Sequence, residues 1–259
     1  MAYNLNDKLV IAISSRALFD LEEENQIFEK DGLDAYYKYQ LENEDKSLKK
    51  GTGYRLVENI LKINSFFSSD ERQVEVIILS KNNAATSLRI TNAINDLKLD
   101  IIRSAWTSGT NISNYLKAFK VDLFLSADDN DVLNAIENGV AAAKILHSNE
   151  NIHNISNEQV RIAFDGDAVL FSEESELIYK NNGLDAFIEH EKLNKDNPLE
   201  MGPFAKLLLI IAKIQAKFPT DKSPIRTALV TARSAPTHER VIKTFNLWGV
   251  RVDEAFFLG

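Results

Sequence analysis

Short runs of consecutive apolar residues alternate along this chain with longer segments in which apolar residues recur every three or four positions. The short runs predict β-strands buried on both faces, and the longer segments predict amphipathic helices. The predicted strands cover residues 10–13, 74–79, 101–106, 123–126, 160–164, 227–230 and 254–258. The predicted helices cover residues 22–44, 54–67, 84–97, 131–146, 173–195, 204–218 and 236–248. This alternation predicts an α/β fold, with a parallel sheet flanked by helices.

The two halves of the chain repeat each other at a constant offset. The tetrapeptide Gly-Leu-Asp-Ala begins at Gly32 and again at Gly183, which are 151 residues apart. Between residues 11–36 and 162–187, 10 of the 26 aligned positions are identical, whereas average residue usage predicts about one or two. A repeat of this length has the size of a domain. We therefore predict two tandem Rossmann-like units that arose by internal duplication.

The predicted units cover residues 1–150 and 151–259, with a boundary near residues 148–157. The alignment continues without a gap to Ser108, which falls on Gly259. Beyond Ser108 the first half continues with a further apolar strand and a long helix. We therefore expect the second unit to be truncated at its C-terminal end.

Composition narrows the class of protein. The chain has no cysteine, which fits a reducing compartment and excludes thiol nucleophiles and cysteine-bound zinc. Its formal net charge of −8 and isoelectric point near 5.2 disfavour binding to nucleic acid or to anionic lipid. Its apolar runs are too short to cross a bilayer. We expect a cytoplasmic protein that binds neither nucleic acid nor membranes.

Two carboxylates, Asp165 and Asp167, directly follow the predicted strand 160–164. In an α/β sheet this places them at the carboxyl end of a strand, where ligands bind. A hard cation such as Mg²⁺ would compensate their charges. The pair then favours phosphoryl transfer, in which one carboxylate attacks phosphorus and the other handles the leaving-group proton. The spacing alone leaves a second interpretation open, a surface turn with two solvated acids.

The sequence around these carboxylates, Asp-Gly-Asp-Ala-Val-Leu-Phe at 165–171, resembles the first motif of haloacid-dehalogenase-like phosphatases. Longer strings are similar to the cytosolic type I 5'-nucleotidase family; they lie at 14–20, 115–119, 125–128, 164–172, 231–235 and 253–258. The resemblance runs from Leu9 to Gly259. It implies a haloacid-dehalogenase-like fold for each unit. The helix-rich segment between 165 and 231 is long enough for a small cap over the active site.

This resemblance implies a Mg²⁺-dependent 5'-nucleotidase that hydrolyses nucleoside 5'-monophosphates such as AMP through an aspartyl-phosphate. Asp165 would be the nucleophile. Asp167 would protonate the 5'-oxygen and then activate water. The Asp165 carboxylate and the main-chain carbonyl of Asp167 would hold the metal. The family's phosphate-binding lysine and final acidic pair would lie beyond Gly259, so we expect residues 1–259 alone to turn over slowly or not at all.

The resemblance also implies a phosphate-binding segment after the strand predicted at 227–230. It consists of Thr231, Ala232 and Arg233, and the Thr231 hydroxyl would hydrogen-bond a phosphoryl oxygen. The alternative for Thr231 is a helix cap.

The first half differs from the second at the aligned positions. It has Ser14 and Arg16 where the second half has Asp165 and Asp167. An arginine does not deprotonate, so this unit should not form an aspartyl-phosphate. Two interpretations remain open: a pure scaffold, or an anion or nucleotide-effector site formed by Ser14, Ser15 and Arg16.

Three functions are therefore compatible with the sequence. We favour a 5'-nucleotidase with an active second unit and a degenerate first unit. The alternatives are a phosphatase of another small phosphomonoester and a non-catalytic nucleotide-binding protein. A sheet edge exposed near residues 256–257 would also favour homo-oligomers.

Overall fold

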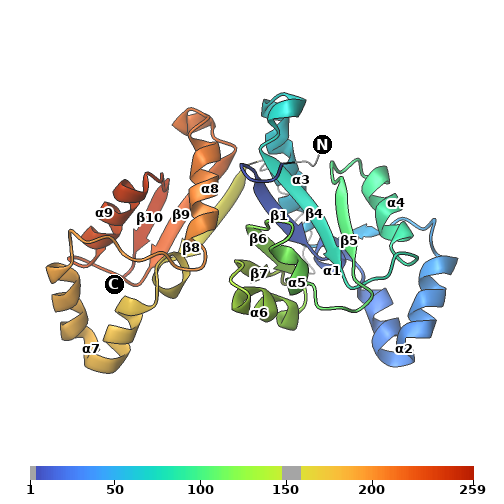
Figure 1. Ribbon diagram of the computed structural model, residues 1–259, viewed down its shortest axis with the longest axis horizontal. Coiled ribbons are helices and arrows are strands. Elements are labelled where there is room, and N and C mark those ends of the chain that lie inside the picture. The colour runs from blue at the N-terminus through green and yellow to red at the C-terminus, as the bar shows by residue number, and fades with distance from the viewer. Residues whose placement is uncertain (1–3, 148–158) are drawn as a thin grey trace. The chain divides into compact units, whose positions relative to one another are not determined.

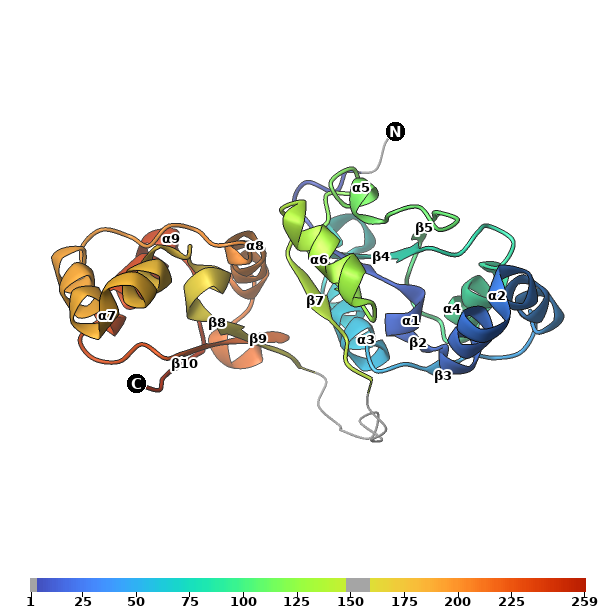
Figure 2. The ribbon, with the colours of Figure 1, turned by 90° about the horizontal axis from the view of Figure 1, so that it is seen from below.

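The computed structural model describes residues 4–147 and 159–259, which form two compact units (Figures 1 and 2). Unit 1 is Met1–Asn157 and unit 2 is Glu158–Gly259. The predicted boundary, residues 148–157, lies outside the described residues. Each unit is considered by itself below.

Unit 1 is built on a parallel sheet with the strand order β5-β4-β1-β6-β7. Its strands are β1 (Leu9–Ile13), β4 (Val74–Ser80), β5 (Arg103–Trp106), β6 (Leu123–Ser126) and β7 (Ala142–Lys144). Every residue of β1 and β4 is buried, because helices cover both faces of the sheet. Apolar side chains of α5 (Ser113–Leu116) and α6 (Asp129–Glu137) pack against one face.

The remaining elements of unit 1 surround this sheet. They are the helices α1 (Ser15–Leu18), α2 (Glu22–Glu42), α3 (Tyr54–Lys62) and α4 (Leu88–Asp96), the 3₁₀ turns η1 (Ile63–Phe66) and η2 (Ser69–Glu71), and an antiparallel ribbon of β2 (Phe19–Asp20) and β3 (Lys49–Lys50).

Unit 2 contains a parallel sheet with the strand order β10-β9-β8. Its strands are β8 (Val160–Asp165), β9 (Ile225–Thr231) and β10 (Glu254–Phe257). Its helices are α7 (Glu174–Leu193), α8 (Ala205–Gln215) and α9 (His238–Trp248), with a π-helical turn at Gly166–Leu170 and a 3₁₀ turn, η5, at Thr220–Lys222. The predicted α/β class, with parallel sheets flanked by helices, is confirmed in both units.

Some sequence-based predictions are wrong in detail. The helix expected over 131–146 ends at Glu137, and Ala142–Lys144 instead forms β7 beside β6. Gly139 adopts a positive φ of 74° there, which ends the helix and lets the small apolar residues after it join the sheet. Burial on both faces is also wrong for unit 2, where β8 alternates between buried and exposed residues along most of its length.

The two units correspond closely at the offset of 151 residues. Strands β4 and β9, strands β5 and β10, and the turns η2 and η5 each have identical lengths and begin 151 positions apart. These matches support the internal duplication, which stays our proposal.

One shared feature is a sharp bend in the first long helix of each unit, α2 and α7. Figure 1 shows the bend in α2 and in α7. It lies at Gly32 (φ 85°, ψ −176°) in α2 and at Gly183 (φ 83°, ψ −179°) in α7. Glycine is needed because this backbone region is closed to residues with a side chain. Each bend returns the second half of the helix toward the rest of its unit.

We expect Gly183→Ala to lower the free energy of unfolding of unit 2 by about 1–3 kcal/mol through backbone strain. No atom lies within 4 Å of the added Cβ, so steric overlap does not contribute. Urea unfolding can be followed by Trp248 fluorescence in a Trp106→Phe background, since the chain has only 2 tryptophans. The control is Asn182→Ala, at the neighbouring exposed position, which should change stability very little. Equal effects of the two variants would contradict the strain argument.

Candidate functional site

The candidate site of unit 2 is built where β8 and β9 end side by side. Their parallel register pairs Asp165 with Val230, which places Asp165 beside the last residues of β9. The Asp165 side chain is exposed, and its Oδ1 accepts a hydrogen bond of 2.6 Å from the Gly166 N–H. A Cβ at Gly166 would lie 3.1 Å from Thr231 Oγ1. Glycine therefore allows the two strand ends to approach closely.

After Asp165 the chain turns sharply. Gly166–Leu170 forms a π-helical turn in which Ala168 takes a positive φ of 61°. A non-glycine residue in this region is uncommon and marks a conformation that its surroundings hold in place. The turn places the Asp167 side chain against Arg233, which follows β9.

Arg233 holds Asp167 with two hydrogen bonds. Its Nε and Nη2 donate to the two carboxylate oxygens of Asp167 at 2.8 and 2.6 Å. The Arg233 residue is only 3% exposed, whereas the Asp167 side chain is 22% exposed. A two-pronged pair between a planar guanidinium and a carboxylate fixes orientation as well as distance. Asp167 therefore has one defined position at the edge of the sheet.

Arg233 is in turn anchored by Glu191, a residue of α7. The Arg233 Nη1 donates to Glu191 Oε2. The other oxygen, Oε1, accepts hydrogen bonds from Arg240 Nη1 at 2.9 Å and Ser175 Oγ at 2.8 Å. Glu191 is 1% exposed and Arg240 is 4% exposed. The four ionised side chains form a row of alternating charges that joins the loops after β8 and β9 to α7 and α9.

The pKa shifts of Glu191 and Arg233 agree with this alternation of negative and positive charges. Burial raises the pKa of Glu191, but the charge and hydrogen bond of Arg233, the Ser175 hydroxyl and the charge of Arg240 together bring it below its usual value. Burial lowers the pKa of Arg233, but Asp167 and Glu191 raise it to above its usual value. Each charge is therefore stabilised by neighbours of opposite sign. Both shifts favour the ionised forms of Glu191 and Arg233.

The structure brings together the residues that the sequence predicted for this site. Thr231 Oγ1 accepts a hydrogen bond of 3.2 Å from the Arg233 N–H, and its own proton remains available for an acceptor. Ala232 is exposed at the same edge. The Arg233 guanidinium is fully engaged by two carboxylates, and its predicted contact with phosphate stays a prediction. Sequence reasoning missed Glu191 as a partner of Arg233; the only signal for Arg240 was its alignment with Arg89.

The donor set at this edge fits a magnesium ion that keeps most of its water ligands. Asp165 offers an exposed carboxylate, and the backbone turn at Asp167 offers a carbonyl oxygen in the same loop. Mg²⁺ is usually held by one or two carboxylates together with water and substrate phosphate. The Asp167 carboxylate is paired with Arg233 and is not available as a ligand. Among the described residues, no three acidic or histidine side chains gather tightly enough to hold a metal alone.

At the corresponding edge of unit 1, hydroxyl groups replace the carboxylates. Ser14 follows β1, and the hydroxyls of Ser15 and Ser80 hydrogen-bond each other at 2.9 Å. Arg16 lies 3.9 Å from Glu22, a long ion pair in which the Arg16 side chain is 39% exposed. A cavity of about 590 Å³ is lined in part by Ser14, Ser15, Arg16, Ser80 and Asn82.

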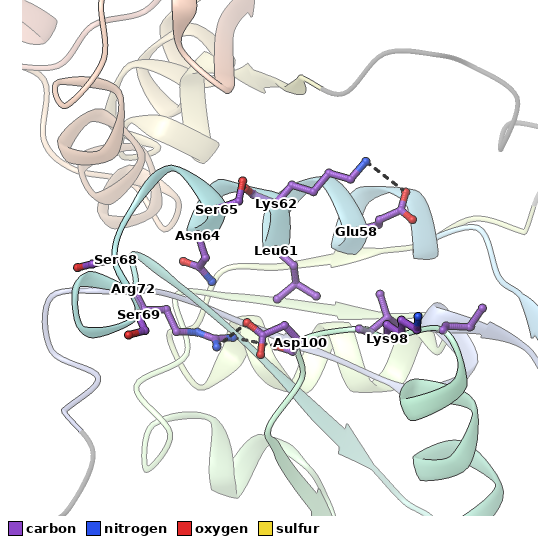
Figure 3. Close-up of a pocket in the computed structure, with 12 residues that line it drawn as sticks. Glu58, Leu61, Lys62, Asn64, Ser65, Ser68, Ser69, Arg72, Lys98 and Asp100 are labelled. Carbon is purple, nitrogen blue, oxygen red and sulfur yellow. Dashed lines mark hydrogen bonds and ion pairs between the residues drawn. The ribbon is translucent and has the colours of Figure 1, made fainter.

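A second cavity of unit 1, of about 630 Å³, lies at the opposite edge of the sheet, where β4 and β5 begin (Figure 3). Its basic side chains face acidic ones: Arg72 Nη1 lies 2.6 Å from Asp100, and Lys62 lies 4.0 Å from Glu58. None of the predicted site residues lines it. Because ligands bind at the carboxyl edge of parallel sheets, we assign no chemistry to this cavity.

Comparison with known proteins agrees with the sequence resemblance. Residues 1–259 match the family described as 5'-nucleotidase. The chain is also 37% identical over 259 residues to a human protein named cytosolic 5'-nucleotidase 1B. That alignment covers 96% of this chain and 42% of the human protein, so the chain spans about two fifths of the length of this relative. Within the described residues, no helix is both long and apolar enough to cross a membrane.

We expect Arg233→Ala to destabilise unit 2 by about 3–5 kcal/mol, because it leaves the buried Glu191 and the half-buried Asp167 without their shared cation. Unfolding by urea, followed by Trp248 fluorescence, measures the change. The matched control is Lys243→Ala, which removes a cation paired with Asp196 and Glu239 on the surface. Solvent screens that pair, so a far smaller effect is expected. Similar losses in both variants would mean that the buried network contributes little.

Proposed function

We propose, on the premise that this chain belongs to the 5'-nucleotidase family, that its second unit hydrolyses nucleoside 5'-monophosphates to nucleoside and phosphate. One observation carries the proposal. At the carboxyl edge of a parallel sheet, Asp165 ends β8 with an exposed carboxylate, Thr231 ends the neighbouring β9, and a second carboxylate, that of Asp167, is held in a fixed orientation. This arrangement suits in-line transfer of a phosphoryl group to a carboxylate.

In the first step, an oxygen of Asp165 attacks phosphorus and the bond from phosphorus to the 5'-oxygen breaks. Asp167, which must first take up a proton from solvent, gives that proton to the departing 5'-oxygen. In the second step, Asp167 takes a proton from water, the water oxygen attacks phosphorus, and the bond to Asp165 breaks to release phosphate. Because Arg233 binds both oxygens of Asp167, proton delivery requires Asp167 to exchange one of these hydrogen bonds for the substrate oxygen.

Thr231 would orient the phosphoryl group. Its hydroxyl accepts the Arg233 N–H and has its own proton free to donate to a phosphoryl oxygen. Mg²⁺, when bound, would supply positive charge that offsets the charge building up on the phosphoryl oxygens. The Asp165 carboxylate and the Asp167 carbonyl would hold it. The orientation of the reacting groups comes from the protein side chains.

The comparisons support this proposal over two rivals, the hydrolysis of another small phosphomonoester and nucleotide binding without turnover. The human relative's name describes a 5'-nucleotidase in the cytosol. We propose the same compartment and substrate class for this chain.

We expect Asp165→Asn to lower the rate of phosphate release from AMP by on the order of 1,000-fold or more, because an amide is a poor nucleophile. The rate is measured with Mg²⁺ in this chain and in any longer natural polypeptide that contains it. The control is Asp185→Asn, an exposed acid on α7 outside the site, which should leave the rate unchanged.

The three candidate functions give different results in this assay. A faster release from sugar phosphates than from any nucleotide would favour a phosphatase of another class. AMP binding without release in the longest natural form would favour the non-catalytic alternative. Turnover by Asp165→Asn within a few-fold of the unchanged protein would remove Asp165 from the role of nucleophile.

A further inference from the structure

We propose that unit 1 binds a phosphate monoester that carries an aromatic group, such as a nucleoside 5'-monophosphate, and does not hydrolyse it. The site is the cavity of about 590 Å³ at the carboxyl edge of its sheet. This volume lies within the usual range for small-molecule sites, about 300–1,000 Å³. The inference concerns binding by unit 1 and holds whether or not unit 2 is an enzyme.

The polar end of the cavity offers donors that suit a phosphate. Ser14, Ser15 and Ser80 present hydroxyl groups there. Arg16 presents a guanidinium whose only ion-pair partner within the described part of the chain is Glu22, at 3.9 Å. The Asn82 Nδ2 atom is buried and has no hydrogen-bond partner among residues 4–147 and 159–259. A buried unpaired donor is costly, and a ligand oxygen would satisfy it.

Two of the four acidic side chains of the lining are paired with cations. Glu24 pairs with Arg89 at 2.5 Å, and Asp131 pairs with Lys81 at 2.6 Å. The other two accept hydrogen bonds from neutral groups, Asp128 from the Asp131 N–H at 3.0 Å and Glu29 from the Asn25 amide at 2.8 Å. Among the ionised groups of the lining, Arg16 is therefore the one best placed to bind an anion.

The other end of the cavity is apolar and faces solvent. Phe28 and Leu33, from either side of the bend in α2, are 47% and 63% exposed. Phe28 packs edge-on against Tyr36, with ring centroids 5.9 Å apart. Large apolar groups at the mouth of a polar cavity suit a ligand with a flat apolar part next to its phosphate.

Hydrolysis is not expected at this site. Ser14 occupies the position of Asp165 in the repeat, and its hydroxyl contacts another hydroxyl, that of Ser126, at 3.4 Å and the Ala17 N–H at 3.3 Å. Neither group removes a proton from serine. Arg16, which occupies the position of Asp167, cannot act as a proton donor or acceptor at neutral pH. The ligand would therefore be held unchanged.

Calorimetric titration of the full chain with AMP tests the proposal. It is done in EDTA, because Arg16 rather than a metal supplies the charge. We expect Arg16→Ala to weaken AMP binding at least 10-fold. Lys38→Ala is the matched control, since it removes an exposed cation of α2 outside the cavity. Circular dichroism confirms that each variant is folded.

Two further titrations define the ligand. Adenosine should bind at least 10-fold more weakly than AMP, because it lacks the phosphate. Phe28→Ala should weaken AMP binding but not the binding of inorganic phosphate. The proposal is overturned if no AMP binding is measured at millimolar concentration, if Arg16→Ala binds AMP as well as the unchanged chain, or if adenosine binds as tightly as AMP.

A different observation, a comparison of the buried ion pairs, assigns Glu191 as a positioning residue for Asp167; this second inference rests on the proposed function. Both units tie two helices together with an arginine. In unit 1, Arg89 Nη1 bonds Glu24, and its Nε bonds the Lys46 carbonyl at 3.1 Å. In unit 2, Arg240 Nη1 bonds Glu191, and its Nε bonds the Asn197 carbonyl at 2.9 Å.

The acid that pairs with this arginine stands at a different aligned position in each unit. Unit 1 has Glu24 and Gln40 where unit 2 has Ser175 and Glu191 at the 151-residue offset. Either arrangement gives the helix arginine its acidic partner. Only a carboxylate at position 191 also reaches Arg233 and, through it, Asp167. Unit 1 has Asn82 in place of Arg233. An acid at position 40 would therefore have no second arginine to bind.

The double variant Ser175→Glu/Glu191→Gln transfers the arrangement of unit 1 into unit 2. Arg240 keeps an acidic partner, while Arg233 loses one. We expect the thermal unfolding midpoint to stay close to that of the unchanged protein. The kcat for AMP should fall at least 10-fold, with little change in KM, because Asp167 is less well oriented for proton transfer.

A second substrate separates positioning from a purely structural role. An aryl phosphate such as p-nitrophenyl phosphate has a leaving group that needs little protonation. Its kcat should therefore fall much less than that for AMP, and this comparison stays valid even if the double variant is less stable. Equal losses for both substrates, or no loss for AMP, would overturn the inference. If the unchanged protein is no faster than Asp165→Asn, the proposed function itself fails.

Discussion

The contact between Arg233 and Asp167 is the interaction on which the geometry of the candidate site depends. It joins two loops that leave neighbouring strands, and it fixes a carboxylate that would otherwise rotate freely in solvent. A buried arginine is costly unless several acceptors surround it. Glu191 and Asp167 together satisfy it, and Arg240 then balances Glu191. Each charged side chain therefore offsets the cost of burying the neighbour of opposite charge.

The two units show how a similar backbone frame supports two different electrostatic sites. Both have parallel strands that end at one edge, a bent helix over that edge and an arginine that ties helices together. In unit 2 this edge carries Asp165, Asp167 and Arg233. In unit 1 it carries Ser14, Arg16 and Asn82. We propose that this exchange of two acids for a hydroxyl and a cation distinguishes a site for covalent chemistry on phosphorus from a site that only holds an anion.

The bend in α2 and α7 links the backbone to both sites. In unit 2, the second half of α7 carries Glu191 back to the loop after β9. In unit 1, the second half of α2 carries Tyr36, whose hydroxyl hydrogen-bonds Asn82 at 2.8 Å. Burial raises the pKa of Tyr36 above its usual value, although the hydrogen bonds with Gln40 and Asn82 oppose this shift. A neutral phenol is therefore retained beside the cavity. A straight helix would carry these side chains away from the strand ends.

The sequence by itself determined the α/β class, most strands and helices, the repeat at 151 residues and the positions of Asp165, Asp167 and Thr231. These features depend on local periodicity and on short motifs, which neighbouring residues specify. Only the tertiary structure decided that Arg233 pairs with Asp167, that Glu191 anchors Arg233, and that Ala142–Lys144 is a strand. Glu191 lies 42 residues from Arg233 along the chain, and no local pattern distinguishes it from the solvated acids of the same helix. Its role arises because the bend at Gly183 and the packing of α7 enclose one carboxylate between two arginines.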